Sequence, residues 1–460
     1  MRHYDIVIVG SGPAGIFAAL ELLRHSREVT ILIVEKGKDI DDRSCPMRKW
    51  DVSCSECPEC ALLSGWGGAG AYSDGKLTLS PHIGGSLANY VGVEFLSSLI
   101  GDADRTYLAY GAPDVLYGTN EDEVATLSRR ASEHELTFIP SKIRHIGTDR
   151  CRTILGNIKR SLENRVDLLF RSKVSKVLVS RRKASGIQLD DGTKFSADYV
   201  ILAPGREGSR WLEREAKRLR LTLLKNPVDI GVRVEVKADV LEPLTSVAYE
   251  PKLVFRSRTF NDRVRTFCVN PYGEVVKEYL KGIWTVNGHS FSQRRTPNTN
   301  FALLVSTFFT EPFDQPIRYG TYIAGLANLL GKGVLVQRLG DLRRGRRSTP
   351  ERIAQGAVVP SLKDATPGDL SFALPYRYLA NILEMLEAMD NIAPGVNSDD
   401  TLLYGAEVKF YSVSPKLTPS LETERPNLFA VGDGAGVSRG LMQASVSGII
   451  AAREIIRRLS

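Results

Sequence analysis

The sequence lacks the features that mark membrane, fibrous and disulfide-rich proteins. Six cysteines among 460 residues are too few for a disulfide scaffold, and no run approaches the roughly 18 apolar residues of a membrane-spanning helix. Internal repeats and low-complexity tracts are also missing, which excludes collagen-like chains. The first residues lead straight into the strand-like run Ile6–Val9, without a signal peptide or transit segment. We therefore expect a cytoplasmic protein.

A large excess of charge of one sign is missing as well. The 61 basic and 53 acidic residues give a net charge of +8, which is mild for this length. This balance is compatible with an acidic cofactor or an anionic substrate and disfavours nucleic acid as the main partner. The densest basic run, Arg343–Arg347, is interpreted as a solvated loop in preference to an anion site. The hydrophobic content of 43% is that of a globular protein, and the length predicts two or three domains.

The first 35 residues indicate a nucleotide-binding unit. Strand-like Tyr4–Val9 is followed by a glycine turn at 10–15, helix-like Ile16–Arg24 and a second apolar run at Thr30–Val34. In such a turn, Gly10 permits the tight bend, Gly12 lets the backbone approach a pyrophosphate, and Gly15 lets the helix pack on the strand. The pyrophosphate would lie at the helix N-terminus, where free N–H groups point toward it.

An acidic residue ends the second run at the distance expected for a ribose contact. Glu35 lies 20 residues after Gly15 and can accept hydrogen bonds from ribose hydroxyls. A carboxylate at this position disfavours the 2′-phosphate of NADP. The pattern alone does not separate FAD from NAD.

Two further motifs resemble those of glutathione-reductase-type FAD-binding oxidoreductases. Asn427–Gly436 is a strand that enters an acid-bearing glycine turn, and Arg439–Ala444 continues into an alanine-rich helix. Tyr199–Gly205 is similar to the middle motif of the same family, with Pro204 where threonine is usual. The resemblance implies that Asp433 binds the ribitol chain and that 440–444 lies beneath the flavin carbonyls.

The resemblance and the N-terminal turn together imply a set of FAD-binding residues. Val174 enters this set as a backbone contact to adenine. The full set is Gly10, Gly12, Pro13, Ala14, Gly15, Glu35, Lys36, Gly67, Gly68, Val174, Ala203, Gly205, Gly432, Asp433, Gly440, Leu441, Gln443 and Ala444.

Three segments resemble, more closely, the poorly characterised FAD-dependent dehydrogenase family of bacteria and archaea. They are Gly65–Leu77, Asn287–Ser290 and Asn300–Leu304. This resemblance implies a flavin oxidoreductase and does not identify a substrate. A second glycine fingerprint is missing, because Gly331-Lys332-Gly333 is too short, so we expect no dedicated nicotinamide domain. Ferredoxin, a quinone and NADH all remain open as electron donor or acceptor.

Four of the six cysteines form a cluster in the sequence. Cys45, Cys54, Cys57 and Cys60 lie within 16 residues, a density that scattered cysteines would not produce. The double two-residue spacing favours a [4Fe–4S] cluster, which could pass electrons to FAD. A four-cysteine zinc site, a redox-active disulfide and plain thiols remain alternatives.

Three side chains outside the FAD motifs are candidate catalytic residues. Lys76, in the turn Ser73-Asp74-Gly75-Lys76, would stabilise negative charge at the flavin N1–C2=O edge, and Asp74 is its neighbour. A structural turn with an ion pair explains the same residues equally well. Histidine side chains ordinarily titrate near neutral pH, so His289 is a candidate general acid or base, although a lone histidine is more often structural.

These patterns predict an α/β protein with a Rossmann-like, discontinuous FAD-binding domain and an inserted, mainly β substrate domain. The expected boundaries are 1–225 and 346–460 for the FAD domain and 226–345 for the insertion. The expected function is FAD-dependent oxidoreduction of a small organic substrate, for which the net charge favours an anionic molecule. The alternatives are a flavin-linked thiol–disulfide oxidoreductase and, less favoured, an FAD-containing protein that associates with tRNA.

Overall fold

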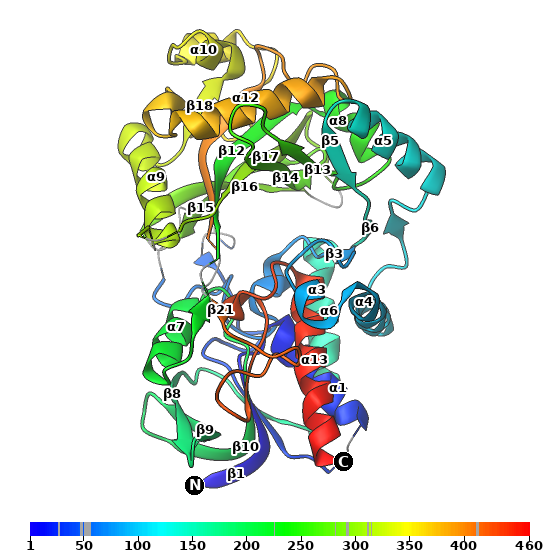
Figure 1. Ribbon diagram of the computed structural model, residues 1–460, viewed down its shortest axis with the longest axis vertical. Helices are drawn as coiled ribbons and strands as arrows, with labels where there is room; N and C mark the ends of the chain where they lie inside the picture. The colour runs from blue at the N-terminus through cyan, green and yellow to red at the C-terminus, as the bar shows by residue number, and fades with distance from the viewer. Residues whose placement is uncertain are drawn as a thin grey trace. The chain divides into compact units, whose positions relative to one another are not determined.

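The computed structural model separates the chain into two compact units. It describes residues 1–25, 28–46, 49, 57–224, 226–280, 282–290, 294–310, 312–313, 315–410 and 414–460. The first unit contains 1–115, 144–226 and 412–460, and the second contains 116–143 and 227–411 (Figure 1). Among the described residues, none of the helices combines the length and apolar character needed to cross a membrane.

The first unit is built on a seven-stranded sheet with the order β7-β2-β1-β10-β9-β8, in which β22 also pairs with β10. Strands β1, β2, β7, β10 and β22 pair in parallel, whereas β8 and β9 form an antiparallel extension. The strands are β1 (Arg2–Val9), β2 (Ile31–Val34), β7 (Asp167–Leu169), β8 (Val174–Ser180), β9 (Lys183–Leu189), β10 (Lys194–Leu202) and β22 (Leu428–Ala430).

Helices from the two ends of the chain meet in this unit. α1 (Pro13–His25) and α13 (Leu441–Leu459) lie side by side in Figure 1, coloured blue and red. Their close approach requires Gly448, because a Cβ atom there would lie 2.0 Å from the carbonyl oxygen of Ala14. The first unit is therefore one nucleotide-binding fold assembled from distant segments, as the sequence predicts.

The remaining elements of the first unit surround the sheet. They are η1 (Gly68–Tyr72), β3 (Lys76–Leu79), α3 (Ala88–Val91), α4 (Val93–Ala109), α6 (Thr148–Leu162), α7 (Ser209–Arg218), β11 (Leu223–Leu224), β21 (Ser414–Pro415) and η3 (Asp433–Ala435). β6 (Lys142–His145) spans the division between the units.

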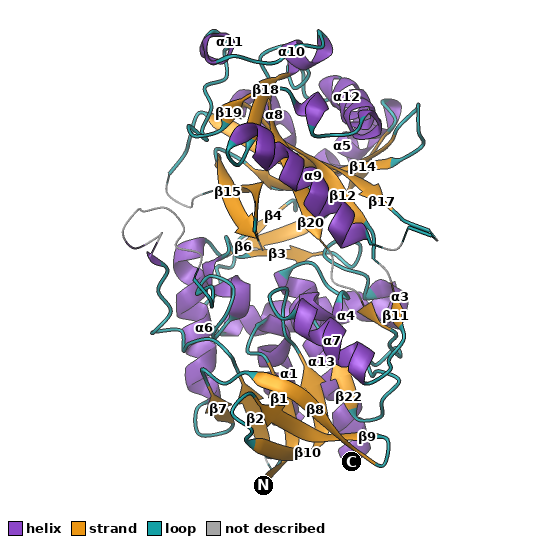
Figure 2. Ribbon diagram, turned by 90° about the vertical axis from the view of Figure 1, so that its left-hand side faces the viewer, coloured by secondary structure: helices purple, strands orange, loops and turns teal. Residues whose placement is uncertain are grey.

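The second unit is built on an eight-stranded sheet with the order β19-β18-β20-β12-β17-β14-β13-β5. The hairpin β15–β16 forms a separate sheet, and α9 lies across the large sheet (Figure 2). The strands of the second unit are β4 (Leu116–Tyr117), β5 (Leu136–Ile139), β12 (Val228–Lys237), β13 (Lys252–Arg256), β14 (Arg263–Asn270), β15 (Glu274–Leu280), β16 (Ile283–His289), β17 (Asn298–Thr307), β18 (Leu335–Arg338), β19 (Thr366–Pro367) and β20 (Leu402–Phe410).

Helices cover this sheet. They are α5 (Glu121–Glu133), α8 (Ala238–Thr245), α9 (Pro316–Gly331), α10 (Leu339–Arg343), α11 (Pro350–Ala354), η2 (Leu370–Phe372) and α12 (Tyr376–Asp390). The predicted fold class is confirmed: a Rossmann-like unit stands in one chain with a sheet-rich second unit.

The division of the chain differs from the boundaries expected from the sequence. Residues 116–143 and 346–411 lie in the second unit, although the sequence pattern assigned them to the FAD domain. The reason is packing: α12 buries Ile382, Met385 and Met389 in the second core, and β20 pairs with β12 near the middle of the large sheet. Periodicity predicts that 376–390 is helical but not which core its apolar face joins.

Candidate dinucleotide-binding site

The N-terminal glycine turn packs tightly on one side and leaves room on the other. Gly10 has φ 106°, and a Cβ atom there would lie 2.1 Å from the carbonyl oxygen of Ala203 at the end of β10. A Cβ atom on Gly15 would lie 2.0 Å from the Gly10 carbonyl oxygen. A Cβ atom on Gly12, in contrast, would meet no heavy atom within 4 Å. This arrangement matches a pyrophosphate cradle, in which the backbone at Gly12 must be approachable.

Glu35, at the end of β2, is a buried hydrogen-bond acceptor. Its Oε2 accepts hydrogen bonds from the backbone N–H and the hydroxyl of Ser11, both at 2.9 Å. Its Oε1 accepts from the N–H groups of Gly37 at 2.8 Å and Gly65 at 2.9 Å. The carboxylate therefore joins the glycine turn to the segment that begins at Gly65, a role that the sequence analysis missed.

Two ligand contacts in this region stay predictions. One is the hydrogen bond from the ribose to Glu35, and the other is a contact between FAD and Lys36, whose Nζ lies 3.5 Å from Glu207.

The segment 65–72 lies directly against the glycine turn. The Gly67 N–H donates to the Ser11 carbonyl at 2.8 Å, and a Cβ atom on Gly68 would lie 3.2 Å from the Cα of Gly12. Trp66 is completely buried, and its indole N–H donates to the Leu155 carbonyl at 2.8 Å. Trp66 is thus a core anchor that holds Gly67 and Gly68 beside the predicted pyrophosphate position.

The C-terminal glycine turn contacts the end of β10. A Cβ atom on Gly434 would lie 2.4 Å from the carbonyl oxygen of Gly205, which places the middle and final motifs against each other. Asp433 accepts a hydrogen bond from the Ser438 hydroxyl at 2.6 Å, and its other oxygen lies 3.8 Å from Arg206 Nε. The Asp433 side chain is 23% exposed, so one edge of the carboxylate can receive a ligand hydroxyl.

The N-terminus of α13 is the next part of the site. Gly440 precedes this 19-residue helix without a side-chain cap, and a Cβ atom there would meet open space. The first N–H groups of a helix lack intrahelical partners and favour electron-rich groups. Gln443 donates to the Ile83 carbonyl at 2.8 Å, which fixes the loop before α3 against the helix.

Four glycine-containing segments therefore converge within the first unit, around Gly12, Gly68, Gly205 and Gly440. The predicted neighbours Pro13, Ala14, Leu441 and Ala444 lie in the first turns of α1 and α13. Val174 opens β8 at the sheet edge and is buried. The room beside Gly12 and Gly440, and the exposed edge of Asp433, match the pyrophosphate and the polyol chain of FAD.

The candidate catalytic residues belong to different units. Lys76 Nζ lies 3.0 Å from an Asp74 oxygen, and the two side chains are only 8% and 19% exposed. β3, which begins at Lys76, contacts α13 in the first unit. His289 ends β16 in the second unit. The structure thus pairs Lys76 with Asp74 and places His289 in a separate unit.

Among the described cysteines, no cluster of metal ligands forms. Cys54 lies outside the described residues, and Cys45, Cys57 and Cys60 are not in disulfides. In the described part of the chain, only His3, Asp5 and Asp198 bring three candidate ligand atoms within 4.8 Å of one another.

Arg43 organises the segment that follows the cysteines. It donates to the carbonyls of Ala61 at 2.9 Å, Leu62 at 3.1 Å and Trp66 at 2.5 Å. Burial lowers the pKa of Arg43 to about 10. No sequence pattern singled this residue out, because its partners are backbone carbonyls.

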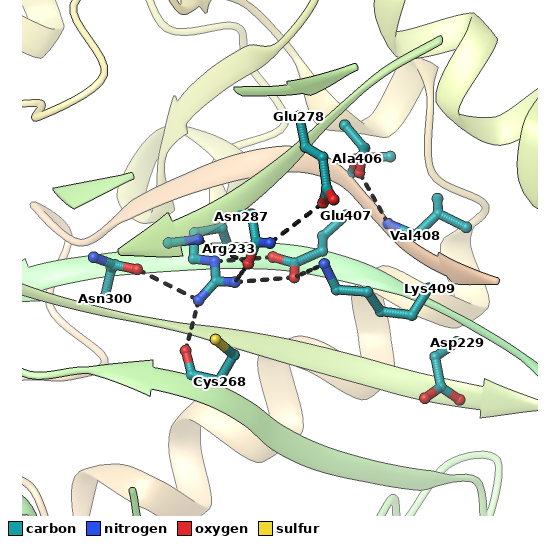
Figure 3. Close-up of polar contacts among 12 residues, drawn as sticks. Asp229, Arg233, Cys268, Glu278, Asn287, Asn300, Ala406, Glu407, Val408 and Lys409 are labelled. Carbon is teal, nitrogen blue, oxygen red and sulfur yellow. Dashed lines mark hydrogen bonds and ion pairs between the residues drawn. The ribbon is translucent and has the colours of Figure 1, made fainter. Parts of the chain in front are cut away.

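The second unit contains a buried polar cluster, which Figure 3 shows. Arg233 on β12 and Glu407 on β20 are both fully buried, with Nε and Oε2 3.0 Å apart. Arg233 also donates to the Cys268 carbonyl at 2.7 Å and to Asn287 at 3.1 Å, and Lys409 lies 3.0 Å from Glu407.

This cluster explains two of the sequence motifs. A Cβ atom on Gly288 would lie 2.1 Å from Asn300 Oδ1 and 2.4 Å from Asn270 Nδ2. Gly288 is therefore needed for β16 to approach β17, and the asparagines of both motifs serve the interior of the second unit. The sequence analysis identified the motifs but not this role.

The fold and the converging glycine segments define an FAD-dependent oxidoreductase. Comparison with known proteins supports this class. Residues 4–226 match the family described as pyridine nucleotide-disulphide oxidoreductase. Residues 227–410 match the FAD-dependent protein, C-terminal domain-like, family, and 363–460 match glucose inhibited division protein A. The predictions of FAD as cofactor and of oxidoreductase activity are confirmed.

A relative in Clostridium beijerinckii, an uncharacterised protein, is 28% identical over 480 residues, which cover 98% of this chain and 80% of the relative. Similar solved structures include formate oxidase from Aspergillus oryzae RIB40, with 12% identity, a TM-score of 0.46, and coverage of 100% of this chain and 98% of that chain. Glycine oxidase from Geobacillus kaustophilus is similar with 15% identity, a TM-score of 0.40, and coverage of 100% and 95%.

Proposed function

We propose that this oxidoreductase binds FAD in the manner of glutathione-reductase-type flavoproteins and exchanges electrons with a small, anionic organic substrate. The convergence of the segments around Gly12, Gly68, Gly205 and Gly440 in one unit carries the proposal. When bound, FAD supplies hydride or electron transfer. The chain's own residues supply binding, orientation and charge.

Each part of the site has a role in this proposal. The turn at Gly12 and the N-terminus of α1 bind the pyrophosphate, and Asp433 accepts from the ribitol hydroxyls. The N-terminus of α13 has no side-chain cap and would lie toward the carbonyls of the flavin ring, where its free N–H groups would favour negative charge. Lys76 holds a positive charge beside α13, while Asp74 fixes the position of its ammonium group. The positive net charge supports an anionic substrate.

The test begins with the purified protein. We expect a flavin absorption spectrum and the release of FAD on denaturation. Mixing the anaerobic holoprotein with panels of carboxylic acids, amino acids and NADH should identify a reductant that bleaches the flavin. Lys76→Gln should slow this bleaching, whereas Lys217→Gln, at an exposed position on α7 outside the site, should not. A protein that is colourless and does not take up added FAD would overturn the proposal.

A [4Fe–4S] cluster at Cys45, Cys54, Cys57 and Cys60 is a separate part of the proposal. The spacing of the cysteines in the sequence is what supports it. The described thiols do not form a group of metal ligands. We therefore assign it no step in the reaction. Anaerobically purified protein should contain iron and acid-labile sulfide, and Cys57→Ser should lose both. Bound zinc, or protein without metal, would contradict the cluster.

A further inference from the structure

The turn between β10 and α7 presents an arginine next to the candidate FAD site. The Arg206 side chain is 60% exposed, and its Nε lies 3.8 Å from the Oδ2 of Asp433. This separation is too long for a hydrogen bond. In the described part of the chain, the Arg206 guanidinium makes no hydrogen bond. Its N–H donors are therefore available to a ligand.

The backbone that carries Arg206 is fixed. The Arg206 carbonyl accepts hydrogen bonds from the backbone N–H of Ser209 at 3.3 Å and from the Ser209 hydroxyl at 2.8 Å. A Cβ atom on Gly208 would lie 2.5 Å from the carbonyl oxygen of Pro204, so the turn closes tightly before α7. Arg206 therefore stays at the carboxyl end of β10, whereas its exposed side chain can adjust to a ligand.

The turn with Asp433 connects Arg206 to the predicted pyrophosphate position. A Cβ atom on Gly432 would lie 3.0 Å from the Cβ of Ala14, in the first turn of α1. A Cβ atom on Gly434 would lie 2.4 Å from the carbonyl oxygen of the residue that precedes Arg206. The short turn that carries Asp433 therefore contacts the N-terminus of α1 on one side and the Arg206 segment on the other.

The charges at this junction favour a cation. The pyrophosphate of FAD is dianionic, and the Asp433 carboxylate lies beside its predicted position. The N-terminus of α1 supplies only a fraction of a positive charge. Lys36 Nζ lies 3.5 Å from Glu207 Oε1, so the lysine charge is already compensated. Arg206 is thus the cation of this turn that remains to offset the phosphate charge.

The chemistry of arginine suits this task. Its planar guanidinium presents parallel N–H donors that match the oxygens of a phosphate. The contact with Asp433 does not by itself explain the arginine, because an ion pair of this length with an exposed arginine contributes little to stability. The Asp433 carboxylate instead keeps the guanidinium near the phosphate position.

We propose that Arg206 binds the pyrophosphate of FAD and offsets its charge. The inference rests on the proposed FAD site and adds to it a side chain that the sequence motifs do not include. The contact consists of charge-assisted hydrogen bonds from the guanidinium to phosphate oxygens. Because salt screens an exposed charge contact, the affinity for FAD should fall as the salt concentration rises.

Titration of the apoprotein with FAD, followed by flavin fluorescence, tests the proposal. Arg206→Gln should weaken FAD binding by at least about tenfold at low salt, and its difference from the wild type should shrink at high salt. Arg206→Lys keeps the charge without the planar donors, so its affinity should lie between the two. ADP carries the pyrophosphate without the flavin, so its competition with FAD should be weakened to the same extent in Arg206→Gln.

Arg105→Gln is the matched control. Arg105, on α4 of the first unit, is 72% exposed and pairs with Asp102, so this variant removes the same charge from the same unit. It should bind FAD with the wild-type affinity. Circular dichroism and urea unfolding show whether each variant keeps its fold.

The role of Arg206 would be overturned by an FAD affinity that Arg206→Gln leaves unchanged. A loss that is the same at low and high salt would also overturn it, as would a loss for FAD that ADP does not share. A wild type that takes up no FAD would instead contradict the proposed function itself, so the two failures are distinguishable.

Discussion

At the scale of single residues, the glycines of the first unit divide into two groups. Gly10, Gly15 and Gly448 allow backbone contacts that a Cβ atom would block at about 2 Å, so they are required for the fold itself. Gly12 and Gly440 face open space, so the protein alone does not require them. The proposed FAD site would account for glycine at both positions.

This division predicts separate effects on folding and on FAD. Gly12→Val should weaken FAD binding by at least about tenfold because its side chain enters the pyrophosphate position. The free energy of unfolding of the apoprotein should change by only about 1 kcal/mol. FAD titration followed by fluorescence and urea unfolding measure the two effects. Gly156→Ala, inside α6, should leave FAD binding unchanged, and equal affinities in both variants would contradict the assignment.

At the scale of elements, the buried ion pair joins β12 to β20. Arg233 and Glu407 are fully buried, so each compensates the other's desolvated charge. Glu407→Leu should lower the free energy of unfolding by about 3–5 kcal/mol, because it leaves the Arg233 charge buried. The double variant Arg233→Met with Glu407→Leu should regain part of that loss in urea unfolding.

A surface pair gives the comparison for this prediction. Glu213 and Lys217 lie 2.7 Å apart on α7, with the lysine 66% exposed. Glu213→Gln should cost less than about 1 kcal/mol. A loss for Glu407→Leu as small as this would show that the interior pair is solvated.

The C-terminal turn of α13 has a pH-dependent contact. Hydrogen bonds from Arg457 and Arg458 lower the pKa of Glu454 from 4.5 to about 2. A lowered carboxylate pKa stabilises the folded state above about pH 4.5, and this contribution disappears as the pH falls toward 2. Glu454→Gln should therefore reduce stability by up to about 1 kcal/mol at pH 7 and have no effect near pH 2. Thermal unfolding across this range measures the difference, and a difference that does not shrink with acid would contradict the assignment.

At the scale of the whole molecule, the two units have separate apolar cores. One core collects residues around β1, α1 and α13, and the other collects residues around β12, β17 and α12. All the glycine segments of the candidate FAD site lie in the first unit.

We therefore expect two unfolding transitions, only one of which responds to FAD. A ligand stabilises the folded state that binds it, so added FAD should raise the midpoint of the first unit and leave that of the second unchanged. Calorimetry of the apo and holo proteins measures this, with fluorescence from the flavin identifying the first unit. A single transition, or an equal shift of both midpoints, would contradict independent units.

The candidate site could be predicted from sequence where its chemistry is local. The turn at 10–15 and the turn with Asp433 each place their special residues within a few positions, so spacing alone indicates a strand, a turn and a helix. Contacts such as Glu35 with Gly65, or Arg43 with the Trp66 carbonyl, leave no comparable pattern.

Composition and the absence of long apolar runs determined from the sequence that the protein is globular, and the glycine turn at 10–15 indicated a dinucleotide. The resemblance of the later motifs to those of known flavoproteins implied that the dinucleotide is FAD. The tertiary structure alone decided which core receives 346–411 and how Arg233 meets Glu407, 174 positions away. It also decided which side of α9 is buried in the second core and which side faces solvent. The physical reason is that backbone conformation follows from neighbouring residues, whereas burial depends on which distant surfaces meet.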